Sequence, residues 1–141
     1  PPKIYYEETT KEYYKEIDEF NKLADEMNLI CTYNLESKED VQNLRIKYIE
    51  EVTPLKEERE KLRQLYKKAT NEADKTIIQA KIDIITEDIN KINNKIQTCK
   101  RIITKAEKGE KETILINNRA LENQQNNEQE KSRNINKKRV R

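Results

Sequence analysis

The chain has 141 residues, of which 40% are charged and 33% hydrophobic, with one Gly, three Pro and no His. This composition argues against a compact domain with one deep core and favours long helices that share narrow apolar seams. The absence of His removes imidazole acid–base catalysis and the commonest protein ligand of metal ions, and no apolar run is long enough to span a membrane.

The net charge of +2 conceals a gradient along the chain. Residues 1–36 carry four basic and nine acidic side chains, residues 37–109 carry 17 and 13, and residues 110–141 carry eight and five. This distribution permits contact with nucleic acid without requiring it.

The chain begins at Pro1 without an initiator Met or a targeting segment, so we expect it to be a piece of a longer protein. Cys31 and Cys99 lie far apart in the sequence. We expect reduced thiols and a cytoplasmic protein.

Residues 1–36 predict an extended lead-in over residues 1–9, followed by an N-terminal helix. The helix is expected to begin near Thr9 or Thr10, where a hydroxyl can cap free backbone N–H groups. The tyrosines near this end are interpreted as packing rings; base stacking and nucleophilic chemistry are the alternatives. The apolar stripe of the helix has helical spacing: Tyr13, Ile17, Phe20, Leu23, Ala24 and Met27.

Residues 30–37 interrupt the periodicity, and Ser37 with Asp40 is typical of a capping box that opens a second helix. Pro54 predicts a local bend in this helix, and Arg59 is expected to extend over its apolar stripe to a carboxylate. The stripe runs to the end of the helix: Val41, Leu44, Tyr48, Val52, Leu55, Arg59, Leu62, Tyr66 and Ala69.

A third helix is predicted over residues 72–108, because its apolar residues recur in alternating steps of four and three, which is the heptad repeat of a coiled coil. A turn is expected at residues 70–74, where Asn71 and Asp74 offer cap signals. Residues 37–109 then form an antiparallel coiled-coil hairpin; one continuous, dimerising helix is the alternative. The seam residues are Ile78, Ile82, Ile85, Ile89, Ile92, Ile96, Cys99, Ile103 and Ala106.

Gly109 is expected to end the third helix through a left-handed cap. The polar composition of residues 110–141 predicts a mostly disordered basic tail. Such a tail binds phosphate backbones weakly, or serves only as a solubilising terminus. The fold class predicted for the whole chain is therefore all-α.

No Gly-rich phosphate loop or nucleophile elbow is present. The carboxylates lie on solvated helix faces next to Lys and Arg. We predict no catalytic residue, no cofactor and no metal site, and we do not expect the chain to be an enzyme by itself.

Residues 23–103 combine three features in order: a helix-opening run at residues 35–41, the set Arg59, Leu62 and Arg63, and a closing motif in which Ile102 follows Cys99 by three residues. This arrangement resembles the C-terminal helical region of relaxase/mobilization nucleases from conjugative plasmids and integrative elements of Gram-positive bacteria. The family often has Arg-Ser soon after the closing Ile, where this chain has Thr104-Lys105.

The resemblance implies a non-catalytic accessory region that docks other mobilization or coupling proteins, or holds DNA next to the nuclease domain. The DNA-nicking tyrosine and the His-bound metal of such enzymes belong to a nuclease domain that this chain lacks. The alternative is a coiled-coil scaffold or spacer without a role in DNA processing, and homodimerisation is left open. Charge and position select the candidate contact residues: Lys47, Arg59, Arg63, Lys67, Lys95, Lys100, Arg101, Lys137, Lys138, Arg139 and Arg141.

Overall fold

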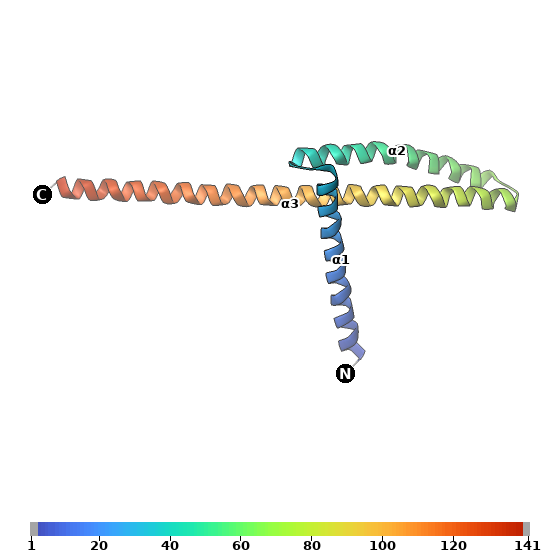
Figure 1. Ribbon diagram of the computed structural model, residues 1–141, viewed down its shortest axis with the longest axis horizontal. Coiled ribbons are helices and arrows are strands. Elements are labelled where there is room, and N and C mark those ends of the chain that lie inside the picture. The colour runs from blue at the N-terminus through green and yellow to red at the C-terminus, as the bar shows by residue number, and fades with distance from the viewer. Residues whose placement is uncertain (1–2, 140–141) are drawn as a thin grey trace. The chain divides into compact units, whose positions relative to one another are not determined.

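The computed structural model describes residues 3–139, with side chains described for residues 9–110 and 115–135. Helices α1 (Lys3–Tyr33), α2 (Lys38–Lys68) and α3 (Glu72–Arg139) account for nearly all of this range (Figure 1). No strand occurs among residues 3–139, so the prediction of an all-α fold is confirmed. The chain divides into two compact units, Pro1–Ile103 and Thr104–Arg141.

Helix α1 is longer than predicted at its N-terminal end and begins at Lys3, so the extended lead-in over residues 1–9 is wrong from that residue onward. Helix α1 ends at Tyr33, because Asn34 has a left-handed backbone (φ 50°) that Asn tolerates better than most residues. The Leu35 N–H then donates to the Ile30 carbonyl at 3.0 Å. The predicted break at residues 30–37 is therefore confined to its second half.

Helix α2 begins at the predicted capping box. The Asp40 N–H donates to the Ser37 hydroxyl at 3.2 Å, and the Ser37 N–H donates to the Asp40 carboxylate at 3.3 Å. Pro54 lies inside α2, which follows a curved path in Figure 1. The local bend at Pro54 stays a prediction.

The turn between α2 and α3 lies where the sequence predicted it. The Ala69 N–H caps α2 by donating to the carbonyls of Leu65 and Tyr66. The Asn71 side chain then accepts the Ala73 N–H at 2.9 Å and opens α3. These caps satisfy backbone groups that a tight connection would leave unpaired, so no Gly or Pro is needed.

Within the first unit, α2 and residues 72–103 of α3 lie side by side (Figure 1). Their apolar stripes form the core, and all eighteen residues predicted for the two stripes are buried or half-buried. Ile89 and Cys99 are the most deeply enclosed, at 1% and 0% exposure. The core is narrow and contains these buried side chains: Leu29, Val41, Leu44, Tyr48, Val52, Ile89, Ile96 and Cys99.

The stripe predicted for the first helix is not buried. Of its apolar residues, Phe20 is 70% exposed and Met27 is 65% exposed, and only Ala24 is half-buried. The expectation that the rings of this helix are packed is therefore wrong for Tyr13 and Tyr14, which are exposed and make an edge-to-face contact with each other at 5.8 Å.

The second unit continues α3 to Arg139. Gly109 does not end the helix and has no positive φ, so that prediction is wrong. One Gly costs a helix only about 1 kcal/mol relative to Ala, which good helix formers on both sides can offset. The disorder predicted for residues 110–141 is not confirmed, since residues 110–139 are helical and residues 140–141 lie outside the described range. Within the described range, no helix combines the length and apolar character needed to cross a membrane.

Candidate functional site

The C-terminal third of α1 contacts α2 and α3 in the first unit. Leu29 belongs to the core cluster and is 8% exposed. Glu26 is 4% exposed, and its carboxylate lies 3.7 Å from the Arg101 guanidinium of α3. The Arg101 side chain also donates to the Thr98 hydroxyl at 3.1 Å, which holds the guanidinium in place. The Glu26 carboxylate is buried and the Arg101 guanidinium is partly exposed, so this ion pair places the charge of Glu26 next to an opposite charge where α1 docks.

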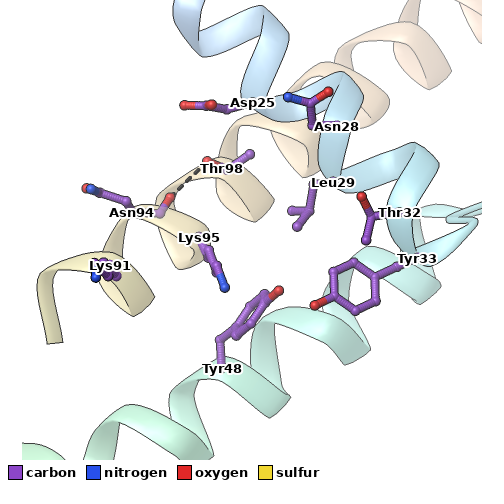
Figure 2. Close-up of a pocket in the computed structure, with 10 residues that line it drawn as sticks. All are labelled: Asp25, Asn28, Leu29, Thr32, Tyr33, Tyr48, Lys91, Asn94, Lys95 and Thr98. Carbon is purple, nitrogen blue, oxygen red and sulfur yellow. Dashed lines mark hydrogen bonds between the residues drawn. The ribbon is translucent and has the colours of Figure 1, made fainter. Parts of the chain in front are cut away.

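A cavity of about 450 Å³ lies next to this contact, where the three helices meet (Figure 2). The Thr98 hydroxyl on its wall donates to the Asn94 carbonyl at 2.8 Å. Lys91 at the rim pairs with Glu87 at 3.4 Å, and both side chains are largely exposed. The cavity is lined by Asp25, Asn28, Leu29, Thr32, Tyr33, Tyr48, Lys91, Asn94, Lys95 and Thr98.

Tyr48 is the most deeply buried polar residue of this cavity, at 4% exposure. Burial raises the pKa of its phenol well above the ordinary value of 10.0. The Tyr33 hydroxyl lies near it in Figure 2 and raises the pKa further, although their geometry does not make a hydrogen bond, and the Tyr48 hydroxyl is buried without a partner. The Lys95 ammonium lies 5.5 Å from the centre of the Tyr48 ring, within cation–π range. Tyr48 is therefore a neutral packing residue at ordinary pH.

Cys99 lies in the core next to this group, and burial raises the pKa of its thiol above the ordinary 9.0, opposed in part by the positive charge of Arg45. A protonated, enclosed thiol is a poor nucleophile. Cys31 is exposed, and both cysteines are free.

Three of the predicted contact residues are engaged within the chain. Arg101 binds Glu26 and Thr98, and Lys95 lies over Tyr48. The Arg59 guanidinium donates to the Thr86 hydroxyl of α3 at 3.5 Å, so its partner is a hydroxyl and not the expected carboxylate. A long side chain near a thin seam meets the facing helix before it meets solvent.

The remaining candidates do not form one site. Lys47, Arg63 and Lys67 are exposed on α2, and Lys100 is exposed on α3. Lys47 lines a shallow surface depression together with Asn43 and Glu50. The side chains of Lys137, Lys138 and Arg139 lie outside the described residues, as does Arg141 altogether.

We call the region where the three helices meet the junction. Glu26 and Tyr48 are the junction residues whose roles the sequence did not reveal. Glu26 looks like one more acid on a solvated face, and its partner Arg101 is far away in the sequence. The one sequence signal for the burial of Glu26 was its position one turn before Leu29, since Leu29 is an apolar residue outside the predicted stripe of α1. Tyr48 was recognised as a core residue, but not as a buried phenol.

Among the residues that the structure describes, no group of three His, Cys, Asp or Glu side chains could hold a metal ion. Tyr48 and Cys99, which are buried where the three helices meet, both favour their protonated forms, and these are the less nucleophilic forms. What it offers chemically is recognition, through apolar walls and a few polar groups.

The comparisons with known proteins do not identify a family. No protein-family model matches this chain, and no curated protein or solved structure shows a significant match. The chain is thus described by its own geometry as an all-helical protein with a narrow core.

Proposed function

We propose that this chain is a non-catalytic helical interaction module, acting as the C-terminal accessory region of a relaxase in the mobilization of a plasmid or integrative element. In this role it docks other mobilization or coupling proteins and DNA. The assignment to a relaxase rests on the resemblance of residues 23–103. We also infer that α2 and the first part of α3 form an antiparallel coiled coil, which their heptad spacing supports.

The observation that supports the docking role is the difference between the inner faces of α2 and α3, which are apolar and buried, and their outer faces, which are charged and exposed. The apolar stripes of α2 and α3 pack against each other, and Ile89 and Cys99 are fully buried between them. The outer faces carry charged side chains in large number, including Lys47, Arg63 and Lys67. A rigid pair of helices with charged outer faces suits recognition by another macromolecule, and steers association electrostatically.

The three exposed residues Lys47, Arg63 and Lys67 provide the test for DNA. Phosphate contacts make affinity fall steeply with salt, and removing one contact lowers the slope of log K against log salt by about 1. We expect the chain to bind duplex DNA of the transfer origin with such a slope. The variant Lys47→Gln/Arg63→Gln/Lys67→Gln should bind more weakly and with a flatter slope.

The matched control neutralises three exposed lysines of α1, Lys11→Gln/Lys15→Gln/Lys22→Gln, which changes the net charge equally. Equal losses in the two variants would indicate a general charge effect and no DNA-binding face on α2. Absence of salt-sensitive binding in the parent chain would remove the DNA part of the proposal. If the triple variant of α2, placed in the full-length relaxase, also left the mobilization frequency unchanged, these residues would have no role in transfer.

The second candidate function is a scaffold or spacer with no role in DNA processing. The helical second unit favours it, because residues 104–139 of α3 extend for about 54 Å at 1.5 Å per residue. If deletion of residues 104–141 impaired transfer and replacement by an unrelated helix of equal length restored it, a spacer role would be supported over specific docking.

A further inference from the structure

The face of α1 that precedes Met27 has no partner in the described chain. We define the open stripe as the six apolar side chains of this face. Four of them are between 60% and 70% exposed: Tyr13 at 60%, Tyr14 at 64%, Phe20 at 70% and Met27 at 65%. Ile17 and Leu23 complete it, at 37% and 50%. We propose that the open stripe pairs with the open stripe of a second copy of this chain.

The spacing within α1 suits pairing with another helix. Tyr13, Ile17, Phe20, Ala24 and Met27 follow one another in alternating steps of four and three, and Cys31 continues the series. This heptad repeat presents knobs and holes along one face, and two identical copies of such a face interlock. The same rhythm occurs in the seam of α3, which is closed against α2.

The charges of α1 do not oppose pairing with an identical helix. In the heptad, the positions that flank the seam are Tyr14, Asn21 and Asn28 on one side and Glu16, Leu23 and Ile30 on the other. Glu16 is the only charged residue among them. The other charged side chains of this segment lie away from the seam, where Asp18 and Lys22 form an ion pair at 3.1 Å. A basic partner helix would gain little from this face, since flanking charges are what select such a partner.

No other described segment of the chain offers a matching stripe. The apolar stripes of α2 and α3 are occupied by each other. The remaining exposed large apolar residues of the described chain are scattered and form no heptad run of this length: Tyr33, Ile46, Ile49, Leu65, Ile77, Ile84, Leu115, Ile116, Leu121 and Ile135. The surface that matches the open stripe in length and spacing is therefore the same stripe on a second molecule.

The area is sufficient for a stable dimer. Aromatic side chains bury about 150–250 Å² each, so the exposed fractions of the open stripe amount to roughly 600 Å² per copy. Complete burial of the open stripe on both copies would remove about 1,200 Å² from solvent, which reaches the lower end of the range for specific interfaces. The stripe includes two tyrosines, a residue type that is enriched among the positions that dominate binding energy in interfaces.

The test is sedimentation equilibrium on the full 141-residue chain at concentrations from about 1 to about 100 µM, a range that detects dimers of micromolar affinity. We expect a monomer–dimer equilibrium for the parent chain. Phe20→Glu/Met27→Glu should raise the dissociation constant by at least about 30-fold, because two central apolar contacts are replaced by buried charges. The control Ile77→Glu/Ile84→Glu changes two α3 side chains with 56% and 63% exposure, and should leave the dissociation constant unchanged.

Circular dichroism shows whether each variant keeps its helix content. Met27→Gln preserves size and helix propensity and should still weaken the dimer if the glutamates unfold α1. Raising the salt concentration should leave the affinity unchanged or increase it, because the contact is apolar and the segment has a net negative charge. A parent chain that stays monomeric at about 100 µM, a dimer that salt dissolves, or a control that dissociates as readily as the α1 variant would overturn the proposal. None of these outcomes depends on whether the chain belongs to a relaxase.

Discussion

Two parts of the first unit have the same heptad rhythm but opposite surroundings. In the seam between α2 and α3, every predicted apolar position is buried or half-buried, whereas the stripe of α1 is mostly exposed. Both links are short, since α1 joins α2 through residues 34–37 and α2 joins α3 through residues 69–71. The difference arises because the apolar stripes of α2 and α3 pack against each other and admit α1 only through Leu29 near its C-terminal end. Periodicity alone does not reveal which stripe stays exposed.

The most direct test of this difference in burial is to replace an isoleucine by alanine in the seam and in the stripe of α1. Ile89→Ala removes a side chain that is 1% exposed in the seam, and should lower the free energy of unfolding by about 3 kcal/mol. Ile17→Ala, on the stripe of α1, should cost under about 1 kcal/mol in dilute solution, where the chain is monomeric. Urea denaturation followed by circular dichroism measures both, and equal losses would contradict the contrast.

Alkaline pH should destabilise the closed seam. The folded-state pKa values of Tyr48 and Cys99 are both raised, so each group stays protonated in the folded chain after the unfolded chain has ionised. These two groups leave the free energy of unfolding unchanged below pH 9.0. Above its ordinary pKa, each group lowers the free energy of unfolding by about 1.4 kcal/mol per pH unit.

Urea denaturation between pH 8 and 11 measures this loss. Tyr48→Phe should remove the contribution that begins near pH 10.0, and should not lower stability at neutral pH, because the hydroxyl is buried without a hydrogen-bond partner. An unchanged pH slope in this variant would show that the Tyr48 phenol ionises freely in the folded chain.

The contact that anchors α1 should respond to Glu26→Gln. The change leaves Arg101 facing a neutral amide, and should weaken the docking of α1 by about 1–2 kcal/mol, since Arg101 is partly exposed and water compensates in part. Hydrogen exchange should accelerate in residues 24–33 and stay constant in the seam. Glu19→Gln, on the exposed surface of α1, is the control and should change neither region.

The smallest expected effect concerns the start of α2. Ser37→Ala removes the side-chain half of the capping box and should cost about 1 kcal/mol. Ser132 is exposed and lies within α3, away from the helix ends. The control Ser132→Ala should therefore have no measurable effect on unfolding of the first unit. A neutral result at Ser37 would mean that water caps α2 as well as the hydroxyl does.

The seam between α2 and α3 could be predicted from the sequence because the features that form it depend on residues close together in the chain. Ser37 and Asn71 cap helices through bonds that span two or three residues. The stripe from Ile78 to Ala106 keeps the heptad period throughout, and the stripe from Val41 to Ala69 departs from it only near Val52. The cap signals at Asn71 favoured a turn over one continuous helix. These are the features that local propensity and periodicity determine.

The candidate site was less predictable because its contacts join distant residues. Arg59 meets Thr86 and Arg101 meets Glu26, and neither partner is distinguishable by type from many others on the same helices. The extent of α3 was missed for a different reason. Gly109 and the polar, Asn-rich composition after it suggested an end. The Gln, Glu, Lys and Arg residues of the same segment favour a helix by backbone propensity, and composition alone did not show which tendency prevails.

The contact between Glu26 and Arg101 also has a consequence for how the chain is made. The ribosome produces α1 first, but the arginine that receives it lies 75 positions later, behind the whole of α2 and the first half of α3. During synthesis Glu26 therefore has no partner until the first half of α3 has been made and the α2–α3 seam can close. Of the three helices, α1 is synthesised first and can dock only after the other two.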